Sequence, residues 1–374
     1  MKSIHRFLLR LRKRFFLIYT RDYIWVSRRR DAKRDLRNIG SHSLPLTPSE
    51  KEEILAFWEP YRSVRKELAW FEFYKASCED LSVLKYYIPD SIYYPEIDMF
   101  FNHPRRCEAL DDKNLYDLYF HDVKMPLTII RIVNGEFFDR DYNLLTFEQA
   151  LDICREAKTG VGKVTRCSFG GHGIKFFDFT SPTAEDELKE YLKHDEDIII
   201  QEVIQQHPFF SNIHPESINT IRMMTLFLDG EVIVVSSILR MGTGKARVDN
   251  GSSGGISCAI NPDGTLKENG RYTTGIKSNQ HPNGTVFKGL KVVGYERCCE
   301  TAKKLALRLF TSTRIISWDF AVGLDGEPIL IELNLTYGGL STHQLNKGPI
   351  FGDLTPLILS RVYASKKDYS YYKN

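Results

Sequence analysis

Two acidic residues and one amide near the end of the chain have the types and spacing of metal ligands. Asp319 lies in one apolar run, Glu332 and Asn334 lie in the next, and Asp325-Gly326 separates the two runs. An Asp-Gly pair between apolar runs is a strong signal for a two-residue β-hairpin loop. Pairing the residues outward from such a loop predicts that Asp319 lies directly opposite Glu332.

Side-chain alternation along a strand places the three polar groups, Asp319, Glu332 and Asn334, on one face of this hairpin. The apolar side chains are expected on the other face: Trp318, Phe320, Ile331 and Leu333. Two opposed carboxylates repel each other unless a cation lies between them. Carboxylate and amide oxygens suit Mg²⁺ when phosphate oxygens and water complete its coordination shell. The alternative is a hairpin whose polar face contacts only solvent.

A glycine-rich segment in the middle of the chain has the composition of a phosphate-binding loop. Its candidate residues are Ser168, Gly170, Gly171, Gly173 and Lys175. Lys163 lies in the predicted strand just before the segment, and Lys113 precedes a predicted short helix. Glycines let backbone N–H groups approach phosphate oxygens, and lysines neutralise their charge. Glycine clusters also mark ordinary turns, and this one matches neither the P-loop pattern nor the dinucleotide-binding fingerprint.

A second Asp-Gly hairpin, around Asp229-Gly230, carries two arginines. Guanidinium groups suit phosphate and carboxylate anions because they form paired hydrogen bonds, so Arg222 and Arg240 are candidate substrate-binding residues. Simple pairing places Arg222 opposite Ser237 and Arg240 on the other face, unless a bulge or a strand end intervenes. Asn250, which opens the glycine-rich loop that follows, is a third candidate.

The predicted metal hairpin resembles the ATP-grasp superfamily, in which an acidic residue on one strand and a Glu-x-Asn on the next hold the magnesium ions that bridge the nucleotide phosphates. Asp319, Glu332 and Asn334 match these three positions. Residues 336–339 resemble the turn that follows Glu-x-Asn in D-alanine:D-alanine ligases, with Gly338 where those enzymes usually carry proline.

The nucleotide-binding candidates follow in the order that this superfamily shows. Lys113 resembles the first phosphate-facing lysine of biotin carboxylase-like members. Lys163 and the glycine-rich segment are similar to the superfamily's lysine strand and flexible loop. Glu202 and Val203 resemble the hinge between two lobes, where a carboxylate and the following backbone groups bind the adenine edge.

The substrate-binding candidates also follow a known order. Arg222, Arg240 and Asn250 are arranged as in glutathione-synthetase and ribosomal-protein glutamate-ligase members, whose arginines face phosphate and substrate carboxylate. Over roughly residues 46–360 the pattern looks most like the sugar-transfer-associated ATP-grasp group, which is linked to cell-surface polysaccharide biosynthesis in bacteria. This resemblance implies an α/β (α+β) fold of two lobes with antiparallel sheets, and it implies ATP and Mg²⁺ as cofactors.

The function that the resemblance implies is a carboxylate–amine ligase, which acts through an acylphosphate on a glycan or another small molecule such as an amino acid. One alternative is a phosphotransferase of the same fold that phosphorylates a sugar or lipid-linked hydroxyl. Another is a non-catalytic module that only binds nucleotide. Product analysis distinguishes the first two, because the ligase forms an amide and the phosphotransferase a phosphate ester.

Alternating helix and strand patterns suggest four segments. They are a basic segment over 1–45, a helical domain over 46–110, a first lobe with the glycine-rich loop over 111–203, and a second lobe with the metal and substrate site over 204–374. The helical domain is expected to begin with a capping box at Thr47 and Glu50. Strands are predicted at 126–133, 161–167, 197–204, 219–228, 231–240, 315–323 and 328–334, and helices at 114–120, 147–157, 184–193 and 295–310.

The cysteine content favours a reducing, cytoplasmic setting. The seven cysteines form no CxxC pair, and an odd count with two adjacent members argues against a disulfide framework. No apolar run approaches the length of a membrane-spanning helix, and the N-terminus lacks the features of a signal peptide. Nucleic acid is not an expected partner, because no basic, aromatic-interleaved surface continues beyond the first segment.

Charge is concentrated at the N-terminus. The net charge is +3, yet residues 1–40 hold 13 Lys and Arg against 3 Asp. Apolar residues recur there at helical spacing: Ile4, Leu8, Leu11, Phe15 and Ile18. Two interpretations of this helix are equally well supported by the sequence. The helix docks on the anionic inner face of the cell membrane, or its apolar stripe packs on its own domain.

Overall fold

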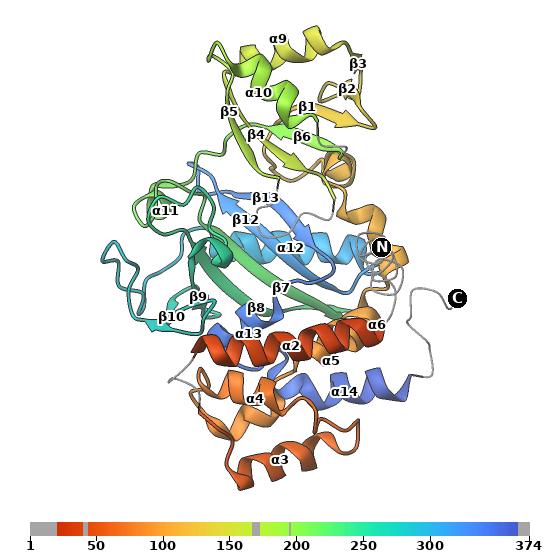
Figure 1. The fold of residues 1–374 in the computed structure, drawn as a ribbon, viewed down its shortest axis with the longest axis vertical. Coiled ribbons are helices and arrows are strands. Elements are labelled where there is room, and N and C mark those ends of the chain that lie inside the picture. The colour runs from red at the N-terminus through yellow and green to blue at the C-terminus, as the bar shows by residue number, and fades with distance from the viewer. Residues whose placement is uncertain (1–20, 40–43, 167–172, 194–195, 366–374) are drawn as a thin grey trace, which may run out of the picture.

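The computed structural model describes residues 21–39, 44–166, 173–193 and 196–365. The predicted fold class is confirmed, because the chain forms two α/β lobes with antiparallel sheets, preceded by a helical region. Figure 1 shows the smaller sheet at one end of the molecule, the larger sheet in the middle and a group of helices at the other end.

The small lobe is a six-stranded antiparallel sheet in the order β3, β2, β1, β6, β4, β5, with two helices on one face. Its elements are β1 (Thr128–Val133), β2 (Glu136–Phe138), β3 (Leu144–Leu145), α9 (Phe147–Ala157), β4 (Thr159–Val164), β5 (Lys175–Asp178), α10 (Ala184–Tyr191) and β6 (Ile198–Gln201). Buried Ile130 and Ile200 of the sheet pack with Leu151 of α9 and Leu188 of α10. The opposite face of this sheet is turned toward the large lobe.

The large lobe is built on a seven-stranded antiparallel sheet in the order β11, β10, β9, β8, β7, β12, β13. Its strands are β7 (Thr220–Leu228), β8 (Glu231–Met241), β9 (Ile256–Ile260), β10 (Leu266–Tyr272), β11 (Lys277–Ser278), β12 (Ile315–Val322) and β13 (Pro328–Asn334). The two predicted hairpins lie side by side, because β7 pairs with β12. Helix α12 (Tyr295–Leu309) packs on one face, where Trp318 and Phe320 are fully buried.

The helical region covers part of the other face of the large sheet. Its helices are α2 (Arg21–Ile39), α3 (Pro48–Trp58), α4 (Leu68–Lys75), α5 (Asp90–Ile92), α6 (Met99–Phe101), α13 (Leu340–Lys347) and α14 (Thr355–Ala364). The predicted capping box at Thr47 and Glu50 is confirmed at the start of α3. Short helices α7 (Pro104–Cys107), α8 (Tyr116–Tyr119) and α11 (Pro208–Ser211) connect the parts.

The face of the large sheet that meets the helical region changes character along its strands. Met224 and Leu226 of β7 and Ile315 of β12 are buried in the same hydrophobic cluster as the helices. Nearer the small lobe, Arg222 of β7 and Asp319 of β12 instead line a cavity. One strand face is thus half hydrophobic core and half polar cavity wall.

Helix α2 is held on the helical region by specific contacts. Arg29 Nε donates to Oε2 of the buried Glu67 at 2.8 Å, and Ala32 is fully buried. Arg28 lies over the rings of Tyr94 and Tyr337. Residues 21–39 therefore pack on the protein's own helices, whereas the predicted apolar stripe from Ile4 to Ile18 lies outside the described residues. Within the described ranges, none of the helices combines the length and apolar character needed to cross a bilayer.

Candidate functional site

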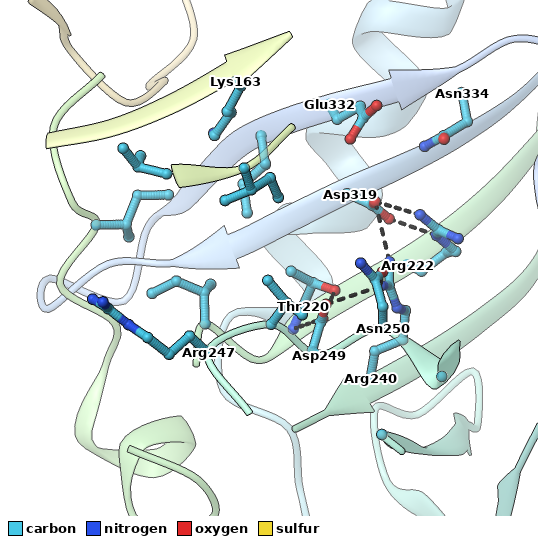
Figure 2. A pocket seen from close by; sticks show the side chains of 18 of the residues that line it. Lys163, Thr220, Arg222, Arg240, Arg247, Asp249, Asn250, Asp319, Glu332 and Asn334 are labelled. Carbon is cyan, nitrogen blue, oxygen red and sulfur yellow. Dashed lines mark hydrogen bonds and ion pairs between the residues drawn. The ribbon is translucent and has the colours of Figure 1, made fainter. Parts of the chain in front are cut away.

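A cavity of about 390 Å³ lies between the small and large sheets. Ten residues proposed from the sequence line it: Lys113, Lys163, Glu202, Val203, Arg222, Arg240, Asn250, Asp319, Glu332 and Asn334. Figure 2 shows most of their side chains converging from both lobes. Ser168, Gly170 and Gly171 lie outside the described residues. The fold therefore gathers candidates that are far apart in the chain into one space.

The two acidic strands pair as predicted, with Asp319 opposite Glu332. Their loop is one residue longer than predicted, because Gly323 N–H donates to the Glu327 carbonyl at 2.9 Å and the three residues between them form the loop. Gly326 closes this loop with a φ of +78°, a left-handed conformation that glycine adopts without strain. The prediction of a two-residue loop was wrong.

A β-bulge between the loop and the acidic pair offsets the extra loop residue, so that Asp319 still lies opposite Glu332. Pairing shifts by one residue between Asp319 and Phe320, and Ile331 has no partner on β12. The extra residue lies toward the cavity beside Glu332. The prediction that Ile331 lies on the buried face was wrong for this reason, whereas the other three apolar side chains are buried as predicted.

A second bulge, in the β7–β8 hairpin, brings the two arginines to the same face. Simple pairing holds only near the turn and then shifts by one residue. Arg222 consequently lies opposite Ile238 rather than Ser237, and Arg240 lies opposite Thr220. The prediction that Arg240 lies on the other face was wrong, and the bulge allowed for as an exception is the reason.

Asp319 is the centre of an ion-pair network on this wall, as Figure 2 shows. It accepts hydrogen bonds from Arg222 Nε at 2.7 Å and from Arg240 Nη1 at 3.3 Å. Burial alone would raise the pKa of Asp319, but the two arginines outweigh burial and lower it. The buried carboxylate is therefore stabilised in its charged form by paired guanidinium groups.

Asp249 belongs to the same network and was not found from the sequence. It accepts hydrogen bonds from Arg240 Nη2 at 2.8 Å and from the Thr220 backbone N–H at 3.1 Å. Asn250 Oδ1 accepts a further hydrogen bond from Arg240. Burial raises the pKa of Asp249, although Arg240 opposes this. The available signal was the Asp-Asn-Gly sequence after β8, but that sequence is also typical of an ordinary turn.

Two lysines place positive charge at the cavity. Lys113 Nζ forms an ion pair with Glu332 Oε1 at 3.1 Å, and Lys163 Nζ donates to Gln201 Oε1 at 3.0 Å. Desolvation, followed by the charge of Lys113, lowers the pKa of Lys163 to about 8. The neighbouring Gly162 packs against an aromatic ring, since a Cβ there would lie 2.7 Å from Tyr191. This close packing holds β4 with Lys163 on the cavity side.

Two other candidates lie in the described part of the chain but do not line the cavity. Lys175 is on the edge strand β5, and its Nζ pairs with Glu187 of α10 at 3.4 Å. Strand alternation turns Ile174 and Phe176 into the cavity instead. Gly173 precedes them with a φ of +74°. The prediction placed Lys175 with the phosphate-binding residues, and the structure separates it from them.

The part of the cavity next to the connection between the lobes is an apolar slot with a polar edge. Val161, Ile174, Phe176, Ile204 and Ile331 supply apolar walls. Glu202 is tied to Leu127, because its N–H donates to the Leu127 carbonyl at 2.9 Å and its Oε1 accepts from the Leu127 N–H at 3.2 Å. The Cζ atom of Arg247, from the large lobe, lies over the ring of Phe176, 3.8 Å from its centre. Such a slot suits a flat heteroaromatic group.

Comparison with known protein families identifies the family of this chain. A family described as sugar-transfer associated ATP-grasp matches residues 95–356, which include every residue that lines the cavity. The chain belongs to this ATP-grasp family. The resemblance found from the sequence is therefore confirmed. A search among curated proteins finds no match.

Several solved structures have a similar arrangement. An L-amino acid ligase from Bacillus licheniformis is 15% identical, with a TM-score of 0.40, and the match covers 69% of this chain and 48% of the ligase. D-alanyl-alanine synthetase A from Vibrio cholerae is 11% identical over 68% of this chain and 65% of its own, with a TM-score of 0.39. Biotin carboxylase from Campylobacter jejuni is 14% identical over 70% and 48%, with a TM-score of 0.42. The chain spans about half the length of the first of these.

The donor set of this ATP-grasp chain fits a magnesium ion. Asp319 and Glu332 are paired across β12 and β13, and Asn334 lines the same cavity. The Asn334 Nδ2 donates to the Ser317 carbonyl at 3.3 Å, which orients the amide. Two carboxylates and an amide are hard oxygen ligands, and the space beside them is large enough for phosphate groups.

Proposed function

We propose that this ATP-grasp protein is a Mg²⁺-dependent ligase that joins a carboxylate to an amine at the expense of ATP. The main support is that positive and negative side chains alternate along one cavity wall. Lys113 pairs with Glu332 and Arg222 pairs with Asp319. Arg240 pairs with both Asp319 and Asp249. In this proposal the wall orients the reacting anions and neutralises their charge.

The reaction requires two transfers at one place. A substrate carboxylate oxygen attacks the γ-phosphorus of ATP, which releases ADP and forms an acylphosphate. An amine then attacks the acyl carbon, and phosphate leaves as the amide forms and the amine loses a proton. Arg222 and Arg240 are proposed to hold the carboxylate and the transferred phosphoryl group, because guanidinium groups bind both anions through paired hydrogen bonds.

The nucleotide is proposed to lie with its base in the apolar slot and its phosphates toward the charged wall. Glu202 and the backbone at Val203 would bind the adenine edge, and Lys113 and Lys163 would bind phosphate oxygens. Mg²⁺, held by Asp319, Glu332 and Asn334, would supply further positive charge to the phosphates. Ser168, Gly170 and Gly171 lie outside the described residues and are given no role here, and Lys175 is left out because it pairs with Glu187.

The substrate is proposed to be a glycan or amino-acid component of bacterial surface polysaccharide synthesis, which accords with the name of the family. The experiment is mass analysis of products formed from ATP and pairs of acceptor and donor. An amide, with ADP and phosphate released in equal amounts, is the expected result. A stable phosphate ester would establish the phosphotransferase instead, and nucleotide binding without turnover across a broad set of acceptors would establish a binding module.

We also propose a cytoplasmic location with a peripheral contact to an anionic membrane surface. The contact was expected through residues 1–40, and we assign it to residues 1–20 because Arg29 and Ala32 pack on the protein's own helices. Residues 1–20 contain 6 Lys and Arg and no Asp or Glu. Each basic residue near such a surface contributes about 1 kcal/mol of attraction. A chain that begins at residue 21 should no longer sediment with phosphatidylserine vesicles, whereas the full chain should. Equal sedimentation of the two chains would contradict the membrane contact.

A further inference from the structure

A second cavity, of about 320 Å³, lies beside the first. The two cavities share three lining residues: Ser257, Thr273 and Thr342. Ser257 of β9 is paired with Arg240 of β8, so the shared wall adjoins the charged network. The second cavity is therefore adjacent to the place where the reaction is proposed to occur. Its volume is at the lower end of the range of about 300 to 1,000 Å³ for small-molecule sites.

The lining of this second cavity is rich in hydroxyl and amide groups and carries little net charge. Polar groups come from Asn38, Ser257, Thr274, Ser341 and Asn346, and aromatic surface comes from Phe73 and Tyr272. Its two charged residues, Arg34 and Asp35, pair with each other at 3.0 Å. Hydroxyl and amide groups beside aromatic rings suit a ligand that has many hydroxyl groups and apolar C–H faces.

Two polar atoms in this lining have no hydrogen-bond partner in the described part of the chain. They are Asn346 Oδ1 and Thr274 Oγ1. The Asn346 side chain is only 6% exposed, and its Nδ2 donates to Ser257 Oγ at 2.9 Å and to the Thr342 carbonyl at 2.8 Å. These bonds fix the amide, so Oδ1 is left as an acceptor. Buried polar atoms without partners are uncommon in proteins, so each of these two atoms is a candidate partner for a ligand hydroxyl.

Helix α2 forms one wall of the second cavity. Arg34, Asp35 and Asn38 line it, and the Arg29–Glu67 ion pair anchors the same helix to the helical region. Phe73 of α4 adds to this wall. All of these residues precede residue 95, where the match to the ATP-grasp family begins. Residues outside the family match therefore form part of the lining of this cavity.

We propose that the second cavity binds the hydroxylated body of a sugar-sized carboxylic acid, and that its carboxylate reaches past Ser257 to Arg240. This inference rests on the proposed ligase function, for which it names the class of the carboxylate substrate. Helix α2 selects the substrate through Arg34 and Asn38, and Thr274 and Asn346 bind its hydroxyl groups. The aromatic rings of Phe73 and Tyr272 exclude ligands that cannot offer an apolar face.

Saturation-transfer NMR on the full chain with Mg-ADP tests this assignment without requiring turnover. The probes are glucuronic, galacturonic and gluconic acids, and cyclohexanecarboxylic acid is the control ligand with a ring and charge but no hydroxyl groups. At least one sugar acid should receive saturation from the protein, and the control ligand should receive much less. Absence of transfer to all three sugar acids, or equal transfer to the control ligand, would overturn the proposal.

Matched variants test whether the sugar acid binds in the second cavity. Thr274→Val removes an unpartnered hydroxyl at nearly constant shape, and Arg34→Gln alters the wall formed by α2. Each should weaken sugar-acid binding about threefold to tenfold, the loss expected for one or two hydrogen bonds. Thr285→Val and Arg37→Gln make the same chemical changes outside both cavities and should leave binding unchanged. ADP affinity and melting temperature should stay the same in all four.

Two results separate this proposal from the proposed function. Sugar-acid binding that none of the cavity variants weakens would refute the second cavity as its site, even if an amide product is found. Conversely, sugar-acid binding that depends on Thr274 and Arg34 would support the cavity even if mass analysis shows a phosphate ester, in which case the ligase chemistry alone fails.

Discussion

The two ends of one face of the large sheet are stabilised by different physics. At the end covered by the helical region, Met224, Leu226 and Ile315 are buried among apolar side chains, and burial itself is favourable. At the end next to the small lobe, Arg222 and Asp319 are buried as ions, which is costly unless each charge is paired. The same strands therefore serve as hydrophobic core and as binding site.

Substitutions at the two ends should have different effects. Paired buried charges contribute little net stability, because the cost of desolvation offsets their attraction. They do, however, hold charged groups in fixed positions where phosphate and metal can bind. Apolar side chains two to four residues away contribute stability and do not line the cavity. Substitutions at the polar end should change activity more than stability, and those at the apolar end should do the reverse.

The largest expected effect is at the polar end, from Glu332→Ala. Loss of this carboxylate removes a proposed metal ligand and leaves Lys113 without the ion pair that holds it. Turnover should fall about 10²- to 10³-fold. The melting temperature should also fall, because the buried Lys113 loses this ion pair. Glu327→Ala, on the same hairpin but paired with Arg297 at the surface, is the matched control. Equal turnover in the two variants would remove Glu332 from the site.

The next effect is at the apolar end, from Leu226→Ala. Leu226 is fully buried, so its truncation should lower the free energy of unfolding by about 2 to 5 kcal/mol. Nucleotide affinity, measured by calorimetry below the melting temperature, should be unchanged. Leu324→Ala at the exposed hairpin loop should alter stability by no more than about 0.5 kcal/mol. A Leu226 variant that loses nucleotide affinity before it loses stability would break the distinction between the two ends.

A smaller effect concerns the pH dependence of nucleotide binding. Desolvation and Lys113 lower the pKa of Lys163 to about 8, so the ammonium is charged below this pH and loses its proton above it. Binding a phosphate favours the charged form, so ADP affinity should fall as pH rises above about 8, by at most about tenfold per pH unit. Lys163→Met should bind more weakly at pH 7 and lose this dependence. A wild-type profile that is flat from pH 7 to pH 9.5 would show that Lys163 does not contact the phosphates.

Much of the fold follows from local sequence signals. Apolar runs on both sides of Asp229-Gly230 and Asp325-Gly326 predicted β7, β8, β12 and β13, and helix α9 was predicted with its observed bounds. Strands β2, β3, β5 and β9 to β11 were not predicted. Segments such as β10 carry glycine and charged residues at positions that local preference assigns to loops, and they become strands because neighbouring strands pair with them.

Residue type and chain order were sufficient to find most of the charged residues that line the cavity, because metal- and phosphate-binding groups are chemically distinctive. They were insufficient for Lys175, whose side chain lies on the outer face of an edge strand, and for Asp249, whose role depends on Arg240. In both cases the direction of a side chain relative to a distant element decides its role.

By itself, the sequence determined which strands carry acids and arginines, since hairpin signals and side-chain alternation act over a few residues. Only the tertiary structure decided that Arg240 and Ile331 face the cavity, because each depends on a β-bulge that reverses the faces beyond it. Each bulge belongs to the pairing of two whole strands within the sheet. The pattern of a few neighbouring residues does not contain that information.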